Sequence, residues 1–480
     1  MLLGLRVPFQ QRTFYFVGIF WLLALTVGVY RYFGPRSKLL EPVVSYELFN
    51  NLEVDVKTKR IFTVCNPTQE IVTGDEGIPN NKQWSLKGLL VLIRHGDRGP
   101  LQHIKNISNI NCGTPDNDLI TSYKSYLHNL TSAGRVSWIG PGSFHGFPLL
   151  PSHEKQCQLG QLTMQGVNQL LHLGHVLKQT YKNIWPRLLN LTQYEISVYS
   201  TRYRRTFQSA LAFLYGLISP ETLTRIAILE SQSMYFCFKD CGCQVTEKYL
   251  KLVQKDISNR LKSHPAISGL AESTGKMIFS SLATNKRHDE DPHAIKDALL
   301  TYVCHGSKLP CVSARNCIKR QNIVGIFAYT DWVSHQKWKN FNWRRLCLLR
   351  SYGLIRHIVS QMLAMFSGPY FILYSGHDHT LEHLSAALGL QNDPLLLRYG
   401  ARLIFEVYHD NNEHGANGLY FRLLANGKDV TKQIDFCKNI VNVNGKASLC
   451  KIEDIVRFSH EDYFSMFNVT NIRDACFQKL

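Results

Sequence analysis

The sequence lacks the short motifs that mark several common classes of hydrolytic and phosphate chemistry. None of its 13 cysteines begins a C-x5-R loop, so a phosphatase that uses a cysteine nucleophile is excluded. No G-x-x-x-x-G-K-[S/T] loop and no H-E-x-x-H pair occurs, which argues against a P-loop and a zinc protease. Internal repeats and low-complexity tracts are also missing, and the 45% hydrophobic content is ordinary for a globular protein. Any phosphate chemistry must therefore use other side chains.

Acidic residues are few relative to basic ones. The chain has 36 aspartates and glutamates against 54 lysines and arginines, which gives a formal charge of +18. The first 40 positions hold five basic residues and no acidic one, so +13 belongs to the rest of the chain. That surplus favours an anionic partner such as a sulfated or phosphorylated glycan, with a merely dispersed basic surface as the alternative. Nucleic acid is not an expected partner, because the features described next indicate a lumen.

Charge is absent from one apolar run near the N-terminus. Residues 13–30 (TFYFVGIFWLLALTVGVY) comprise 18 uncharged positions, about the minimum for a transmembrane helix. The run ends in Tyr30, Arg31 and Tyr32 rather than in small residues, so an uncleaved anchor is favoured over a cleaved signal peptide. Basic residues lie on both sides of the run and leave its orientation open.

Sequons and cysteines indicate on which side of the membrane the chain lies. Glycosylation sequons follow the anchor at Asn106, Asn129, Asn190 and Asn468. Together with the many cysteines they favour an oxidising lumen, with residues 1–12 as a cytoplasmic tail. Disulfides are favoured over structural zinc, since the close cluster of Cys237, Cys241 and Cys243 fits no common zinc spacing. The odd cysteine count predicts one thiol that is free or paired with another chain.

The patterning predicts an α/β domain with a helical cap. Residues 31–83 show no sustained periodicity and are expected to be a luminal stem, before a domain over 84–480. Apolar strands are expected at 89–93, 195–200, 369–375 and 401–408. Helices are expected at 162–181, with Thr163 as its cap, and at 201–218. The stretch of about 219–345, with one short strand at 325–328, is expected to be a largely helical cap that splits the core in sequence.

Two of these strands end in polar turns that contain histidine. RHGDR (94–98) follows the first strand, and GHD (376–378) follows the third, about 280 positions later. The carboxyl ends of parallel strands meet in one crevice, so we expect the turns to converge. Guanidiniums bind phosphate, a neutral imidazole can attack phosphorus, and a protonated carboxyl can release the alkoxide. The turns therefore predict phosphoryl transfer without a metal or other cofactor, because arginines beside His95, His377 and His379 would repel a cation.

The RHGDR and GHD turns, with the LTxxG start of the helix at 162–181, resemble the histidine acid phosphatase family. The similarity spans roughly residues 86–410 and a tail, and it implies a Rossmann-like core, a helical cap and a phosphohistidine intermediate. Stretches such as PLLPSHEKQCQLGQLTMQGV and LYSGHDHTL are most similar to a Golgi type II membrane branch of the family. That similarity implies a substrate, the 2-phosphorylated xylose in the glycosaminoglycan linkage region of proteoglycans. Glycosyltransferases that synthesise glycosaminoglycans are candidate partners.

The resemblance also assigns roles to residues. It places the nucleophile at His95 and the proton donor at Asp378. It places phosphate-binding side chains at Arg94, Arg98 and His377.

One phosphate-binding arginine of the family is missing, because Tyr199 stands at its position. Arg202 and Arg204 are candidates to replace it, and Arg202 is preferred because it is nearer the strand end at Ser200. The alternative is that both side chains lie on a solvated loop.

Two other functions remain open. A catalytically weak glycan-binding protein is suggested by Tyr199 and the basic surplus, although intact His95 and Asp378 argue against it. A broad-specificity acid phosphatase is the alternative among enzymes.

Overall fold

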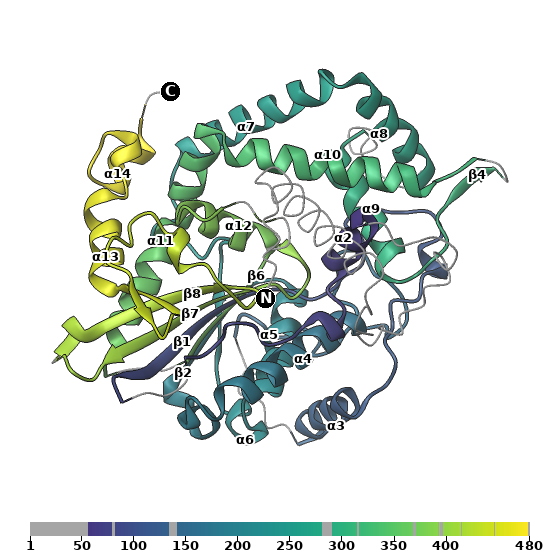
Figure 1. Ribbon diagram of the computed structural model, residues 1–480. Coiled ribbons are helices and arrows are strands. Elements are labelled where there is room, and N and C mark those ends of the chain that lie inside the picture. Colours follow the sequence, from purple (N-terminus) through teal and green to yellow (C-terminus); the bar gives the residue numbers. More distant parts are fainter. Residues whose placement is uncertain are drawn as a thin grey trace, which may run out of the picture. The chain divides into compact units, whose positions relative to one another are not determined.

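The structure is a computed structural model (Figure 1). It describes residues 56–78, 82–133, 142–280, 290–313, 316–367, 371–391, 393, 397–413, 415–445 and 447–478. The expected tail (1–12), the expected anchor (13–30) and residues 31–55 of the expected stem lie outside these ranges. Within the described ranges, no helix combines the length and apolar character that a membrane span requires.

One mixed sheet forms the centre of the domain (Figure 1). Its nine strands are β1 (Trp84–Arg94), β2 (Ile196–Thr201), β3 (Ile228–Ser231), β6 (Phe371–Gly376), β7 (Arg402–Asp410), β8 (Leu419–Ala425), β9 (Lys428–Asp429), β10 (Val441–Val443) and β11 (Ala447–Lys451). They lie in the order β10-β11-β8-β7-β1-β6-β2-β3, with β9 paired to β8. β1, β6, β2 and β3 are parallel, whereas β7 joins β1 antiparallel.

Helices cover both faces of this sheet, which is why β1 is apolar without alternation. Leu89, Val91 and Ile93 pack into one hydrophobic cluster, and Leu90 and Leu92 pack into another on the opposite face. The first cluster includes α3 (Asp118–Ser132), α4 (Met164–Tyr181), α5 (Arg204–Leu217) and α6 (Pro220–Leu223). The second includes α11 (Phe341–Ala364), α12 (Asp378–Ala387), α13 (Ile452–Arg457) and α14 (Ile472–Cys476). The predicted α/β core is confirmed.

The cap is helical, as predicted. It contains the hairpin of β4 (Cys311–Ser313) and β5 (Asn316–Cys317) and the helices α7 (Val245–Lys262), α8 (Pro265–Ile278), α9 (Pro292–Cys304) and α10 (Arg320–Trp338). Two details differ from the prediction. β3 belongs to the central sheet, so the insertion starts after Ser231 rather than near 219. The strand predicted at 325–328 is wrong, because these residues lie inside α10, where Ile323, Ile326 and Phe327 are buried at helical spacing.

Residues 56–78, which we expected to be stem, fold against the domain. They begin with α2 (Val56–Cys65), whose Ile61 packs into the hydrophobic cluster of the cap. Ile71 and Ile78 are buried against α4 and its neighbours. The Glu76 carboxylate accepts a 2.8 Å hydrogen bond from Nε of buried Arg402 on β7. Isolated apolar residues of this kind give no periodic pattern, so the sequence could not place this boundary.

The cysteines form disulfides, as predicted. The six pairs are Cys65–Cys304, Cys112–Cys157, Cys237–Cys241, Cys243–Cys476, Cys311–Cys317 and Cys437–Cys450. Cys347 on α11 is the remaining thiol and is buried. The asparagines of all four sequons are exposed.

Candidate active site

The sheet brings the two histidine-containing turns to one edge. β1 and β6 are parallel neighbours, and Arg94 at the end of β1 lies opposite Gly376 at the end of β6. The backbone N–H of His95 donates to the carbonyl of Gly376 over 3.0 Å, which continues the ladder by one residue. The side chains that follow each strand therefore project into the same crevice.

His95 is held with one ring nitrogen ready to attack. Its Nδ1 lies 2.8 Å from the carbonyl of Gly96, and a carbonyl can only accept, so Nδ1 carries the proton. In a neutral ring the lone pair then lies on Nε2. Burial lowers the pKa of His95 well below its ordinary value, and Arg205, Arg94 and Arg98 lower it further. The imidazole is therefore a neutral base across the physiological range.

Asp378 begins α12 and pairs with Arg94. The closest guanidinium–carboxylate distance is 3.0 Å, and the Arg94 guanidinium also lies 4.6 Å from the ring centre of Tyr399. Burial would raise the pKa of Asp378, but Arg94, His379 and His95 hold it well below its ordinary value. In this state Asp378 is a carboxylate and not yet an acid.

Arg98 connects the catalytic turn to the cap. Its guanidinium lies 2.8 Å from the carboxylate of Asp297 on α9. Burial opposes the charged form, but the attraction of Asp297 prevails and raises the pKa of Arg98. Asp97 has a different environment, because it accepts a 2.5 Å hydrogen bond from Thr163 and lies 2.9 Å from His305 at the end of α9. Asp97 therefore joins α4 and the cap to the turn.

Arg205, which our sequence analysis did not select, completes the cluster of cations. Its guanidinium lies 3.3 Å from Nδ1 of His377 and donates to the carbonyl of Gly160. Burial, and then the like charge of Arg98, lower its pKa to about 10, so the group remains charged at neutral pH. Arg202 and Arg204 are both exposed, and the structure does not bring Arg202 to the crevice.

The position of Arg205 follows from where α5 starts. Tyr203 is the N-cap residue, which places Arg205 in the first turn, one turn before Ser209. The Ser209 hydroxyl accepts a hydrogen bond from the backbone N–H of Gly96, so this side of α5 faces the catalytic turn. Arg205 lies one helical turn before Ser209, on the side of α5 that faces the domain. This helical spacing could have identified Arg205 from the sequence. Tyr199 itself packs elsewhere, stacked on Tyr374 with ring centres 5.5 Å apart.

His377 is oriented by hydrogen bonds on both ring nitrogens. Arg205 can only donate, so Nδ1 accepts from it, and Nε2 donates to the Thr201 hydroxyl at 2.9 Å. Thr201 in turn donates to Thr206. Burial, followed by the charge of Arg205, lowers the pKa of His377 to about 3. The His377 ring is therefore neutral, and its centre lies 5.7 Å from that of His95.

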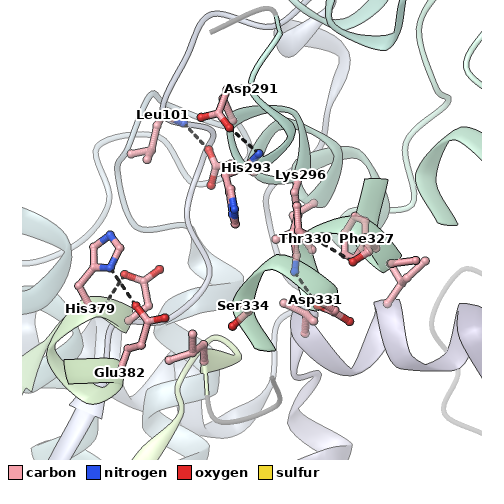
Figure 2. Close-up of a pocket in the computed structure, with 18 of the residues that line it drawn as sticks. Leu101, Asp291, His293, Lys296, Phe327, Thr330, Asp331, Ser334, His379 and Glu382 are labelled. Atoms are coloured by element: carbon pink, nitrogen blue, oxygen red, sulfur yellow. Dashed lines mark hydrogen bonds and ion pairs between the residues drawn. The ribbon is translucent and has the colours of Figure 1, made fainter. Parts of the chain in front are cut away.

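A cavity of about 640 Å³ adjoins this cluster, although His95, His377 and Arg205 do not line it. Arg94, Arg98 and Asp378 line one end of it. Figure 2 shows the rest of its wall, where residues of α9 and α10 face His379 and Glu382 of α12. Ile61 and Val64 of α2 also line it, so the N-terminal segment contributes to the cavity. The arrangement can hold a phosphate at the sheet and a larger group beneath the cap.

Several known proteins are similar to this chain. The profile of the histidine phosphatase superfamily (branch 2) matches residues 85–283. The chain is 31% identical to 2-phosphoxylose phosphatase 1 of Xenopus tropicalis, covering 84% of this chain and 79% of that protein. It is 29% identical to 2-phosphoxylose phosphatase 1 of Homo sapiens, covering 82% of this chain and 81% of that protein. Among solved structures, Hafnia alvei phytase superposes with a TM-score of 0.49 at 16% identity, covering 83% of this chain and 100% of that chain.

Proposed function

The chain belongs to branch 2 of the histidine phosphatase superfamily, and we propose that it removes the 2-phosphate of xylose in the glycosaminoglycan linkage region of proteoglycans. The observation that carries the chemistry is the convergence of the two strand-end turns, which places His95 and Asp378 beside three arginines. The choice of substrate is supported by the relatives named 2-phosphoxylose phosphatase 1. The contacts and charges of the site support the mechanism below.

The arginines bind the phosphate. Arg94, Arg98 and Arg205 all act on His95 electrostatically, so an anion placed beside that ring lies within reach of each. One guanidinium can donate two parallel hydrogen bonds to two phosphate oxygens. Its positive charge offsets the negative charge that spreads over these oxygens during phosphoryl transfer. His377, the N-cap residue of α12, positions Arg205 through the hydrogen bond that its Nδ1 accepts. Phosphate binding requires Arg94 and Arg98 to exchange part of their contact with Asp378 and Asp297 for contact with the ligand.

In the first step, Nε2 of His95 attacks phosphorus while the bond from phosphorus to the sugar oxygen breaks. The product is a phosphohistidine and a sugar alkoxide, which needs a proton to leave as the alcohol. Asp378 supplies that proton. Because its pKa is held low before the substrate binds, the proton comes with the substrate, which is a monoanion below its second pKa of about 6.

In the second step, water replaces the alcohol. The Asp378 carboxylate takes a proton from the water as its oxygen attacks phosphorus, and the bond from phosphorus to Nε2 breaks. His95 returns to the neutral form in which Nδ1 still donates to Gly96, so the same tautomer serves the next cycle. Inorganic phosphate leaves with the proton that Asp378 took from the water, which restores the carboxylate for the next cycle.

We further propose that the enzyme is a single-pass type II protein of the Golgi membrane, with residues 13–30 as its anchor. The exposed sequons and six disulfides support a luminal domain. Glycosyltransferases that build the same glycan are its candidate partners, because they share this compartment and substrate. The protein should lose apparent mass on glycosidase treatment and stay with membranes after alkaline extraction. Recovery mainly in the medium would contradict the anchor.

The activity is tested by phosphate release from a linkage oligosaccharide that carries 2-phosphoxylose, with a simple aryl phosphate as the second substrate. The wild-type protein should release phosphate from both and have the higher kcat/KM on the oligosaccharide. His95→Ala should release phosphate from neither. Equal rates of phosphate release by the wild-type and variant proteins would contradict the proposed enzymatic function. A higher kcat/KM on the aryl phosphate would favour a broad-specificity phosphatase.

A further inference from the structure

The cavity is much larger than a phosphate group. At about 640 Å³ it falls within the range of roughly 300–1,000 Å³ in which pockets enclose whole small ligands. Of the three phosphate-binding arginines, Arg94 and Arg98 line it and Arg205 does not. The part of the wall that α9 and α10 supply, which we call the cap wall, consists of His293 and Lys296 on α9 and Asp331 and Ser334 on α10. Figure 2 shows this wall facing α12 across the open space.

The cations around the cap wall are neutralised by carboxylates. The Lys296 ammonium lies 3.2 Å from Asp331, which joins α9 to α10. Lys337 on α10 lies 2.5 Å from Glu382 on α12. Asp291 at the start of α9 adds a further negative charge to the lining. The cap wall thus has no surplus of positive charge, in contrast to the arginine cluster at the end of the sheet, and it offers no second site for a phosphate.

His293 supplies an uncharged polar group to the cavity. Its ring points into the cavity (Figure 2), and no other described residue forms a hydrogen bond with that ring. Its backbone N–H donates to Asp291, which fixes the start of α9 behind it. His293 is exposed to the open space of the cavity, but the protein atoms around the cavity still lower its pKa to about 4, so the ring is neutral and can both donate and accept a hydrogen bond.

We propose that His293, Lys296, Asp331 and Ser334 form a subsite for the hydroxyl groups of an uncharged sugar, and that the wall excludes ligands bearing a second phosphate there. Sugars present many hydroxyls that both donate and accept, and a neutral imidazole, a serine hydroxyl and a shared ion pair match them. The proposal deepens the proposed function, on which it rests, by naming what recognises the glycan. It assigns the chemistry to the sheet and the choice of substrate to the cap.

The alternative is that Lys296 and Asp331 merely hold α9 against α10. Kinetics with two substrates separate these explanations, because a structural pair would affect every substrate equally. The substrates are the 2-phosphoxylosyl oligosaccharide and an aryl phosphate too small to reach the cap wall. The measured quantity is the ratio of their kcat/KM values, so that a general loss of folded protein cancels.

His293→Ala is the principal variant, since its ring has no partner within the described fold, and Asp331→Asn is the second. His293→Ala should lower the ratio about tenfold, mainly through a higher KM on the oligosaccharide, and Asp331→Asn about threefold or more. His335→Ala is the matched control, because His335 is an exposed residue of α10 outside the cavity lining. It should leave the ratio unchanged. An unchanged ratio in both cap-wall variants would overturn the proposal.

Inositol hexakisphosphate serves as a probe for exclusion of a second phosphate. The wild-type protein should hydrolyse it at least tenfold less efficiently than the oligosaccharide, and comparable efficiency would refute the exclusion. Failure of the subsite is distinct from failure of the proposed function. If the wild-type protein does not dephosphorylate the oligosaccharide, the proposed substrate is wrong. If it does and the variants match it, only the subsite is wrong.

Discussion

The strand-end turns and the cap wall are built in different ways. At the end of the sheet, short contiguous motifs follow β1 and β6, and three arginines surround one imidazole. At the cap wall, single residues of α9 and α10 meet, and their charges are paired. The first arrangement suits one reaction on any phosphate monoester, and the second suits recognition of what the phosphate is attached to. We infer that chemistry and specificity are separable in this protein, and each prediction below tests that separation.

The largest expected effect comes from removing the nucleophile. His95→Ala should lower kcat about 10,000-fold or more on every phosphate ester, since the neighbouring His377 has both ring nitrogens in hydrogen bonds and cannot replace the nucleophile. Phosphate release from the oligosaccharide and from the aryl phosphate measures it, with His128→Ala, an exposed histidine of α3, as the control. A loss confined to one substrate would show that His95 acts in recognition rather than in chemistry.

Removal of the proton donor should reduce the rate by an amount that depends on the leaving group of the substrate. Asp378→Asn should slow phosphohistidine formation from sugar phosphates by roughly 100-fold to 10,000-fold, because their alkoxide needs a proton to leave. An aryl phosphate has a better leaving group and should lose less. Rapid-quench measurement of phosphohistidine formation on both substrates tests this. If both lose activity equally, Asp378 positions the phosphate through Arg94 instead of donating a proton.

The next effect concerns the arginine that lies beside His377. Arg205→Ala removes a charge-assisted bond of about 1.5 to 3 kcal/mol to the phosphate, so kcat/KM should fall roughly tenfold to hundredfold on both substrates. Arg202→Ala is the matched control, because that side chain is exposed, and it should change kcat/KM little.

Arg205→Lys should recover only part of the loss, since an ammonium cannot form the paired bonds of a guanidinium. A large loss for Arg202→Ala with none for Arg205→Ala would restore the sequence-based choice of Arg202 and contradict the structure.

The smallest and most graded effect is that of pH. The low pKa of His95 keeps the nucleophile neutral in acid, so activity should persist well below pH 6.5. On the alkaline side, the substrate loses its second proton near pH 6, and the proton that Asp378 must donate is lost with it. Activity should therefore fall as the pH rises above about 6. Phosphate esters with a lower second pKa should show this fall at a lower pH, and an alkaline limb that does not move with the substrate would contradict the proton source.

Much of the sheet end could be predicted from the sequence. The uninterrupted apolar runs of β1 and β6 indicated buried strands, and the polar turns after them indicated one crevice. The number of residues between the strand end and Arg205 does not show whether its side chain reaches the crevice. That depends on the residue at which α5 begins. Because Tyr203 is the N-cap residue, Arg204 is exposed to solvent and Arg205 lies on the side of α5 that faces the catalytic turn.

The cap end could not be predicted, for a physical reason. Lys296 and Asp331 are 35 positions apart on different helices, and their contact depends on how α9 packs against α10. The same holds for α2, whose Cys65 is bonded to Cys304 on α9 across 239 positions. Such contacts leave no local pattern, because neither helix periodicity nor a motif encodes which distant side chain lies opposite. Functional residues at the strand ends are therefore easier to identify from the sequence than functional residues of the cap.

The most direct test of the central claim is to trap the covalent intermediate. The linkage oligosaccharide with a radiolabelled 2-phosphate on xylose is mixed with the full-length protein, quenched within milliseconds in alkali, and mapped by mass spectrometry. The account predicts an acid-labile, alkali-stable phosphate on His95, formed and lost at rates consistent with turnover, with no label in His95→Ala. Label on another residue, or turnover without any labelled protein, would contradict it.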